Sequence, residues 1–205
     1  CPAPRPHTRP SAPSRIMRKG TCMLNAEGQY VLFVCEGVAE QYILTTLIER
    51  GELTIPADFI VPNQLRGTWY FTRKESKQML DRFLNMSYGE HPLLIVRIVD
   101  SDSDVLRVPR GYEHAAEVVN LRTHPEIEML VIINEGMYGK YTNGSKRAKP
   151  SDYCKQTLGL KQVKSRAWLE RYWAEPGRLE HALKEYSRLH RFGRNENRGL
   201  LELIR

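Results

Sequence analysis

Two long runs of apolar residues dominate the hydrophobic pattern of the chain. Gln29–Cys35 (QYVLFVC) and Leu93–Val99 (LLIVRIV) are rich in β-branched residues, and neither run alternates with polar positions. Continuous runs of this kind are typical of strands that are buried on both faces of a parallel sheet. We therefore predict that these two segments are long, buried strands.

Between and around these runs the pattern changes to a helical period. Val38–Arg50 carries apolar side chains on one face, and a short strand is predicted at Phe59–Val61. Thr72 and Glu75 have the spacing of a capping box, which predicts a second helix that continues to about Met86. This β-α-β-α-β alternation favours an α/β fold with a parallel sheet and right-handed crossovers.

The second half of the chain is predicted to be mainly helical. A helix at Tyr112–Glu117 and a strand at Val118–Leu121 come first. Glu126–Tyr138 follows as a helix or, because it is rich in β-branched residues, as a strand. Residues 139–150 are polar and basic and are expected to form a loop. The remaining helices are expected at Ser151–Leu158, Ser165–Trp173 and Gly177–Arg191.

Composition divides the chain into three parts. Residues 1–26 contain five prolines among basic and small polar residues, so they cannot bury enough apolar surface to offset chain entropy. We expect a disordered leader there, an α/β domain over residues 27–138, and a basic loop with a helical extension packed on the domain over residues 139–205. The full length of 205 residues suits one domain with an appendage.

The charge of the chain favours a polyanionic partner. Its formal net charge is +7, and lysines and arginines that neutralise phosphates release condensed counterions. Lys140, Lys146, Arg147 and Lys149 lie among tyrosines and are the candidate contacts to nucleic acid, with a solvated loop as the alternative. No apolar run is long enough for a membrane span, and the widely spaced cysteines suit reduced thiols, so we expect a cytoplasmic protein with no membrane partner.

Acidic residues follow both of the predicted buried strands. Glu36 comes directly after the first, and Asp100, Asp102 and Asp104 come directly after the second. Ligands of an open parallel sheet bind beyond the carboxyl ends of its strands, and carboxylates are suitable ligands for Mg²⁺ or Mn²⁺. A divalent cation would relieve the repulsion between these carboxylates, polarise a phosphoryl oxygen and activate water. Glu36 is then a general acid/base or a ligand, and Asp100 and Asp102 are ligands.

Two segments carry a resemblance to a known family. VLFVCEG and LLIVRIVDSD resemble the Toprim signature, in which Glu-Gly follows one strand and Asp-x-Asp follows a later one; the resemblance covers about residues 29–135. It implies a Toprim-like Rossmannoid domain and a metal-dependent nuclease that acts on RNA or DNA. CEGVAEQYI and THPEIEMLVIINE further resemble the RloB-like phage-defence branch, which is similar to the overcoming-lysogenization-defect nucleases. That resemblance implies an antiviral effector with an ATPase partner, with homo-oligomerisation left open, and it implies that Glu40 and Glu128 border the metal site.

Each candidate also has a structural interpretation. An acidic run after a strand is often a solvated turn, and Glu40 in the first turn of a helix would complement the helix dipole. Glu128 lies on an apolar segment, where a salt bridge to Arg97 or Arg122 would explain it. The chain as a whole could then be a non-catalytic binding or regulatory module of the same fold that partners an ATPase.

Overall fold

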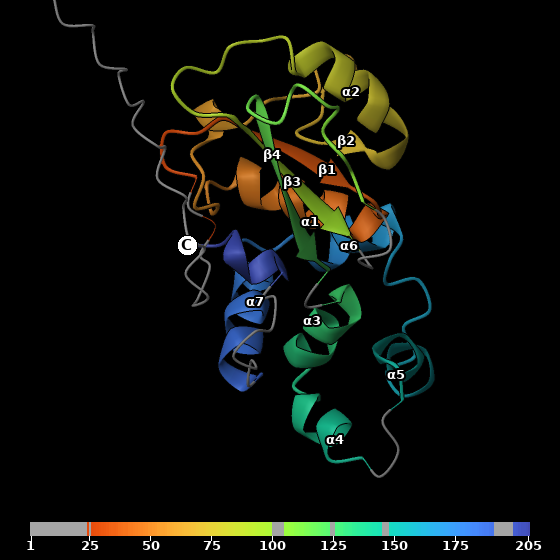
Figure 1. The fold of residues 1–205 in the computed structure, drawn as a ribbon. Coiled ribbons are helices and arrows are strands. Elements are labelled where there is room, and N and C mark those ends of the chain that lie inside the picture. Colours follow the sequence, from red (N-terminus) through yellow and green to blue (C-terminus); the bar gives the residue numbers. More distant parts are fainter. Residues whose placement is uncertain (1–23, 25, 100–104, 124–125, 145–147, 191–198) are drawn as a thin grey trace, which may run out of the picture.

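A four-stranded parallel sheet forms the centre of the molecule (Figure 1). The computed structural model describes residues 24, 26–99, 105–123, 126–144, 148–190 and 199–205. The strand order is β2-β1-β3-β4, and every neighbouring pair is parallel. The strands are β1 (Val31–Cys35), β2 (Phe71–Thr72), β3 (Leu93–Val99) and β4 (Ala116–Arg122). The parallel α/β fold predicted from the sequence is confirmed, and the two apolar runs form the two central strands.

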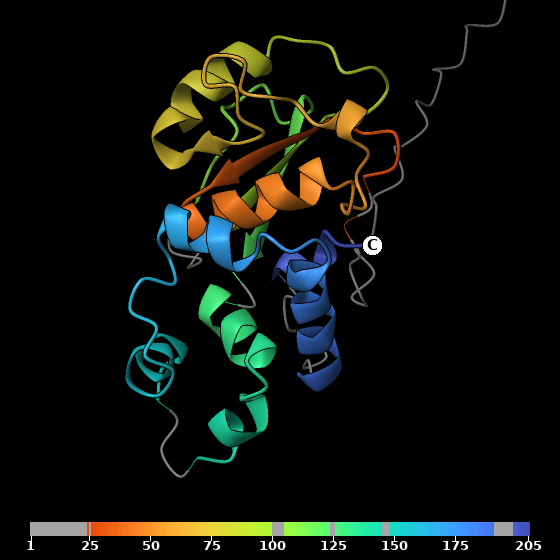
Figure 2. The same cartoon turned by 180° about the vertical axis from the view of Figure 1, so that it is seen from behind.

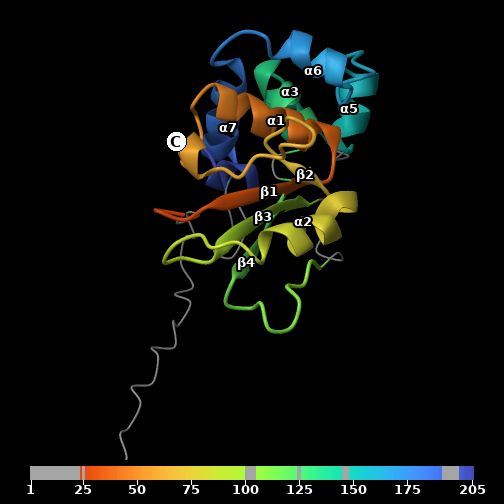
Figure 3. The same ribbon diagram turned by 90° about the horizontal axis from the view of Figure 1, so that it is seen from above.

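Helices cover the two faces of this sheet unequally. Figure 3 shows α2 on one side of the strands and the larger group of helices on the other, and Figure 2 shows α1 and α6 in front of the sheet. The helices on the larger side are α1 (Val38–Glu49), α3 (Ile127–Asn134), α5 (Pro150–Gln156), α6 (Arg166–Tyr172) and α7 (Arg178–Leu189), with the short α4 (Tyr138–Thr142) next to α3. The other side has α2 (Ser76–Phe83).

Burial on both faces explains why the central strands do not alternate with polar residues. All five residues of β1 are buried. Val31, Phe33 and Cys35 belong to the hydrophobic cluster on the α1 side, whereas Leu32 and Val34 belong to the cluster on the α2 side. The C-terminal helices join the first cluster through the fully buried side chains of Cys154, Leu169, Trp173 and Leu183. The helical extension therefore packs on the α1 side of the sheet.

The order of the strands creates a switch in chain direction between β1 and β3. The chain leaves β1 through α1 to reach β2 on one side, and it leaves β3 to reach β4 on the other. The β1–β3 register pairs Cys35 with Ile98. In open parallel sheets the carboxyl ends of two such strands form the crevice where ligands bind. The corresponding strand ends in this chain are Cys35 and Val99.

Two predicted elements are wrong. Phe59–Val61 is not a strand, because Phe59 ends a 3₁₀ turn (Ala57–Phe59) and Ile60 makes only an isolated bridge to Val31. Pro62 follows directly and has no N–H for a sheet hydrogen bond. The second strand is instead the two-residue β2. Tyr112–Glu117 is not a helix, because the chain turns there and enters β4, which pairs with β3 over its whole length.

The remaining predictions agree better with the structure. The Glu75 carboxylate accepts hydrogen bonds from the Thr72 backbone N at 2.8 Å and from Thr72 Oγ1 at 2.6 Å, so the capping box is confirmed. It starts a 3₁₀ turn (Arg73–Glu75) that runs into α2. Glu126–Tyr138 contains the helix α3, so its strand alternative is wrong, and the predicted loop 139–150 contains most of α4.

The outer parts of the chain add little to this description. The predicted leader, residues 1–26, lies almost wholly outside the described residues, and the division into three parts stays a prediction. A final 3₁₀ turn, Gly199–Glu202, leads to the C-terminal residues, which pair with the segment after α1 through a Leu53–Ile204 bridge. In the part of the chain that the structure describes, no helix is long and apolar enough to cross a bilayer.

Candidate functional site

The predicted site lies at the carboxyl ends of β1 and β3. Glu36 follows β1, and Gly37 is the N-cap of α1. β1 and β3 are neighbouring parallel strands, so Glu36, which follows β1, and Val99, the last residue of β3, lie at the same edge of the sheet. Asp100, Asp102 and Asp104 come next in the sequence and lie outside the described residues.

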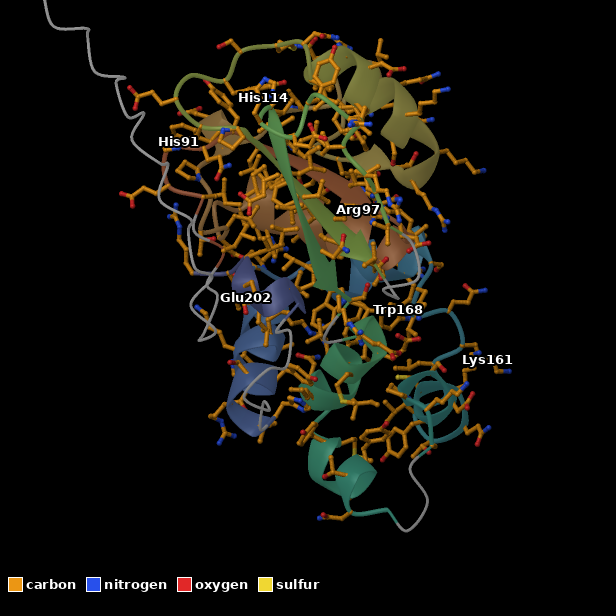
Figure 4. The ribbon with its side chains drawn as sticks, in the orientation of Figure 1. His91, Arg97, His114, Lys161, Trp168 and Glu202 are labelled. Atoms are coloured by element: carbon orange, nitrogen blue, oxygen red, sulfur yellow. The ribbon has the colours of Figure 1, made fainter. Side chains whose placement is uncertain are left out.

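Positively charged side chains surround Glu36. Its Oε1 lies 3.1 Å from Arg73 Nη1, and the two side chains are 34% and 58% exposed. A shallow depression beside this pair is lined by Glu36, Arg73, Arg97 and Val99 together with two apolar residues. Arg97 is buried in β3, near its carboxyl end in Figure 4, and its Nη1 donates to Asn120 Oδ1 at 3.3 Å. Arg73 is therefore the exposed cation beside Glu36, whereas Arg97 is buried beneath this depression.

A second group of charged residues surrounds a cavity on the α1 side of the same edge. The cavity has a volume of about 310 Å³ and lies where the start of α1, the end of β4, the start of α3 and the α5–α6 connection meet. Its lining residues are Ala39, Glu40, Arg122, Thr123, Glu126, Ile127 and Lys164. The fold thus brings Glu40 next to Glu126 and Lys164, although these residues are far apart in the sequence.

Glu128 is the most deeply buried carboxylate near this cavity. It lies in the first turn of α3 and is 1% exposed. Its Oε1 is 3.1 Å from Lys164 Nζ, and its Oε2 is buried with no hydrogen-bond partner among the described residues. Burial lowers the pKa of Lys164, but the hydrogen bond to Glu128 and the charges of Glu128, Glu126 and Glu40 outweigh it and raise that pKa.

The salt bridge predicted for Glu128 has a different partner from the two that were expected. Lys164 pairs with it, not Arg97 or Arg122. Arg97 lies on the same face of β3 as Leu93 and Ile95, because alternate residues of a strand share a face. Leu93 and Ile95 belong to the cluster on the α2 side, so Arg97 faces away from α3. Lys164 comes from the connection between α5 and α6, and no local pattern in the sequence links it to Glu128.

The glycine of the Glu-Gly pair is explained by space and not by backbone conformation. Gly37 has φ −106°, which any residue can adopt. A Cβ at this position would overlap Oε2 of Glu40. Burial, and then the negative charge of Glu40, raise the pKa of the Cys35 thiol at the end of β1. Glu40 is therefore held at the strand end by the missing side chain of Gly37, and its position in the first turn also suits the helix dipole.

No family model, curated protein or solved structure matches this chain. The site is therefore argued from the geometry of the chain itself. Among the described residues, no three His, Cys, Asp or Glu side chains lie close enough together to hold a metal ion. Of the predicted metal-site residues in the described part of the chain, Glu40 lines the cavity and Glu36 lies in the neighbouring depression. Glu128 does not line the cavity but is paired with Lys164, which does.

The predicted nucleic-acid residues lie away from this edge. Lys140 is exposed on α4, and Lys149 is exposed at the N-cap of α5; Lys146 and Arg147 lie outside the described residues. The two helices are joined by an edge-to-face contact of Tyr141 and Tyr153, whose ring centroids are 5.2 Å apart. Figure 1 shows α4 at the end of the molecule that is remote from the sheet. The tyrosines are thus engaged with each other, and contact of the lysines with nucleic acid stays a prediction.

Three cavity residues were missed as site residues from the sequence. Lys164 was noted only as part of the basic C-terminal region, Arg122 only as a possible partner of Glu128, and Glu126 only as the start of a helix. The sequence pointed to this region through Glu40, which lines the cavity, and through Glu128, an acidic residue on an otherwise apolar segment that is paired with Lys164 of the lining. Such a residue requires a counter-charge, but the sequence alone does not identify which cation supplies it.

Proposed function

We propose that this chain is a divalent-metal-dependent nuclease with a Toprim-like fold, which cleaves phosphodiesters of RNA or DNA. The observation that carries the proposal is the pairing of β1 with β3 at the switch in chain direction. This pairing sets Glu36 beside the end of the strand to which the Asp100–Asp104 run is joined in the sequence. The strand order and the sequence positions of the acidic residues therefore point to the same edge of the sheet.

Two acidic residues of the described part of the chain support the proposal of a divalent cation. Glu128 has a buried carboxylate oxygen with no hydrogen-bond partner in the described part of the chain, and Glu40 lies at the adjoining cavity. In this proposal Asp100 and Asp102 would hold Mg²⁺ or Mn²⁺, and Glu36 is either a third ligand or the general base. Glu40, Asp104 and Glu128 are further acidic residues of the site. The bound cation would polarise the phosphoryl oxygen and lower the pKa of attacking water.

The protein side chains have separate roles in this proposal. As a general base, Glu36 would accept the proton of the attacking water. Arg73, which is exposed beside Glu36, binds the phosphate and orients it toward that carboxylate. For this to happen, Arg73 exchanges part of its ion pair with Glu36 for the phosphate. Lys140, Lys146, Arg147 and Lys149 contact the nucleic-acid backbone farther from the reacting group.

The biological setting is part of the same proposal. The similarity of CEGVAEQYI and THPEIEMLVIINE to the RloB-like branch supports a cytoplasmic effector of bacterial antiviral defence. An ATPase partner would then control access of nucleic acid to the nuclease. The similarity also covers Glu40 and Glu128, which lie on different elements but near the same cavity.

A non-catalytic binding module is the second candidate, and the ion pairs favour it. Glu36 is paired with Arg73, and Glu128 is paired with Lys164, so each of these carboxylates already has a cationic partner without any metal. In a regulatory module these pairs would only stabilise the strand ends. In a nuclease these ion pairs must break when metal and substrate bind.

The experiment that separates the two candidates is a cleavage assay. The purified chain is incubated with tRNA, single-stranded RNA and plasmid DNA in Mn²⁺, alongside Glu36→Gln and the control Glu90→Gln, whose side chain is exposed on the loop before β3. We expect cleavage by the wild-type chain and by Glu90→Gln, and loss of cleavage in Glu36→Gln. If the wild-type chain cleaves none of these substrates and its melting temperature does not rise with Mn²⁺, the binding module is the better account.

A further inference from the structure

We propose that two copies of this chain form a two-fold symmetric dimer, in which Leu65 of each copy enters an apolar cavity of the other. The inference goes beyond the proposed function and does not rest on it. The cavity lies at the amino end of β1, whereas the acidic strand ends lie at the opposite edge of the sheet. Figure 1 shows the loop between α2 and β3, which carries part of the lining, at the end of the molecule opposite α4.

The cavity has a volume of about 390 Å³ and lies between the start of β1, the segment before β2 and the end of α2. Aromatic and aliphatic side chains make up most of its lining, and Tyr30, Phe83 and Tyr88 contribute three rings. Tyr30 is 39% exposed and Met86, also in the lining, is 53% exposed. The apolar lining is therefore open to solvent, as in sites that take up a hydrophobic group.

A turn beside this cavity presents Leu65 to solvent. Leu65 is 84% exposed, more than any other large hydrophobic side chain in the described part of the chain. It follows Gln64, which lines the cavity and accepts a hydrogen bond from Arg82 Nη2 at 3.4 Å. Leu65 itself is not part of the lining. The chain thus places an uncovered apolar side chain next to an apolar cavity that this side chain does not fill.

Hydrogen bonds fix the shape of this turn. The backbone groups of Asn63 and Thr68 bond to each other in both directions, at 2.8 and 3.3 Å, and Arg66 N donates to Asn63 O at 3.1 Å. Asn63 is buried, and its side chain donates to Glu75 Oε1 at 3.1 Å, which joins the turn to the capping box before α2. A side chain on a rigid turn loses little backbone entropy when a partner buries it. Leu65 is therefore well placed to anchor an interface.

A protruding apolar side chain and an apolar cavity on one patch suit a second copy of the same chain. In a two-fold dimer every contact occurs twice, so the patch must be complementary to itself. A two-fold axis that passes between Leu65 and the cavity places each Leu65 at the cavity of the other copy. Of the five exposed large hydrophobic side chains in the described residues, this contact covers three: Tyr30, Leu65 and Met86. Gathered apolar exposure of this kind marks an interaction site.

The charges of the patch are complementary to themselves as well. Asp58 and Arg82 both line the cavity and both are exposed. Neither side chain forms an ion pair in the part of the chain that the structure describes. One cation and one carboxylate leave the lining without net charge, so two copies of the patch do not repel each other. Across the two-fold axis, Asp58 of one copy faces Arg82 of the other, and this pair occurs twice.

Sedimentation velocity of the full chain over a range of concentrations tests the dimer. We expect the wild-type chain to dimerise as its concentration rises, and Leu65→Ala to raise the Kd of the dimer by about tenfold or more. Val105→Ala is the matched control, because Val105 is 60% exposed and lies outside the cavity lining, and it should keep the wild-type Kd. A wild-type chain that stays monomeric overturns the inference and leaves the patch to a different protein. A dimer that Leu65→Ala does not weaken overturns it too.

A mixing experiment tests the pairing across the two-fold axis. Asp58→Arg and Arg82→Asp are prepared as separate chains, and circular dichroism checks that each is folded, as expected for changes at exposed positions. Each chain alone should dimerise weakly, because like charges face each other in its dimer. The equimolar mixture should dimerise as well as the wild type, because both sites of the mixed dimer again have one cation and one carboxylate. A mixture that stays monomeric, or single variants that dimerise like the wild type, overturn the inference.

Discussion

Arg73 Nη1 and Glu36 Oε1 lie 3.1 Å apart, although 37 positions separate the two residues in the chain. The pair links the turn after β2 to the end of β1, at the edge of the sheet where we place the metal and the phosphate. Both side chains are substantially exposed, at 58% and 34%, so the pair contributes at most about 1 kcal/mol to stability. Its main effect is to set a fixed positive charge beside the carboxylate.

Arg73→Ala should therefore affect ligand binding more than folding. We expect the free energy of unfolding in urea to change by less than about 1 kcal/mol, because the ion pair is exposed. The affinity for Mn²⁺ should rise, because a positive charge next to Glu36 is removed. Arg110→Ala, at an exposed arginine in the loop before β4, is the control and should leave both quantities unchanged. Weaker Mn²⁺ binding in Arg73→Ala would contradict competition between this arginine and the metal.

Gly37→Ala should disturb the site through Glu40. A Cβ at Gly37 overlaps the Glu40 carboxylate, which is the end of a flexible side chain, so the chain should fold while this carboxylate moves. We expect lower Mn²⁺ affinity by electron paramagnetic resonance and a nearly unchanged circular dichroism spectrum. Gly139→Ala is the matched control, since a Cβ there meets no atom within 4 Å. Equal Mn²⁺ affinity in both variants would show that the position of Glu40 does not matter.

The sequence predicted the two central strands because both faces of β1 and β3 are buried, which leaves a continuous apolar signal. It missed β2 because a strand of two residues has no periodicity. It missed the start of β4 because Glu117 and the residues before it suited a helix equally well, and pairing with β3 decided between the two. Local pattern thus predicted the long elements, and tertiary pairing determined the short ones.

The residues of the candidate site also differ in whether a local sequence pattern could predict them. Glu36 could be found because it follows a strong strand signal, and Glu128 because a carboxylate on an apolar helix is conspicuous. Lys164 could not be found, because its link to Glu128 depends on how the α5–α6 connection folds back over α3. Asp100, Asp102 and Asp104 stay predictions, since they lie outside the described residues.

Glu75→Gln should show how much the charge of the Glu75 carboxylate in the capping box contributes to stability, and how that contribution depends on pH. Burial raises the pKa of the Glu75 carboxyl, but hydrogen bonds from Thr72, Asn63 and Arg66 outweigh it and lower the pKa. The stabilisation is therefore present above the unfolded pKa of about 4.3 and is lost as the pH falls through the lower, folded pKa. We expect the variant to lose about 0.5–2 kcal/mol of unfolding free energy at pH 7. Urea unfolding is measured at pH 7 and at pH 3. The difference in unfolding free energy between wild type and Glu75→Gln should be smaller at pH 3. An equal difference at the two pH values would exclude a role for the charge of Glu75.

The nucleic-acid prediction is tested by salt dependence. Replacing Lys140 and Lys149 together with alanine should weaken binding to single-stranded RNA and flatten the plot of log affinity against log salt concentration. Each lost phosphate contact should reduce the slope by about 0.7. Lys77→Ala, at an exposed position on α2 across the sheet, should leave the slope unchanged. A double variant with the wild-type slope would mean that nucleic acid binds elsewhere on the chain.

The central claim, that carboxylates at the ends of β1 and β3 hold a metal that supports phosphodiester cleavage, is tested most directly by metal removal and replacement. Wild-type chain, Asp100→Asn and the control Asp58→Asn, at an exposed position in the turn after α1, are treated with EDTA, and cleavage of RNA and plasmid DNA is followed as Mg²⁺ is added back. We expect wild type and Asp58→Asn to regain activity, and Asp100→Asn to remain inactive while its melting curve shows a folded protein. Full recovery of cleavage in Asp100→Asn would contradict the metal site, even though the parallel α/β fold would stand.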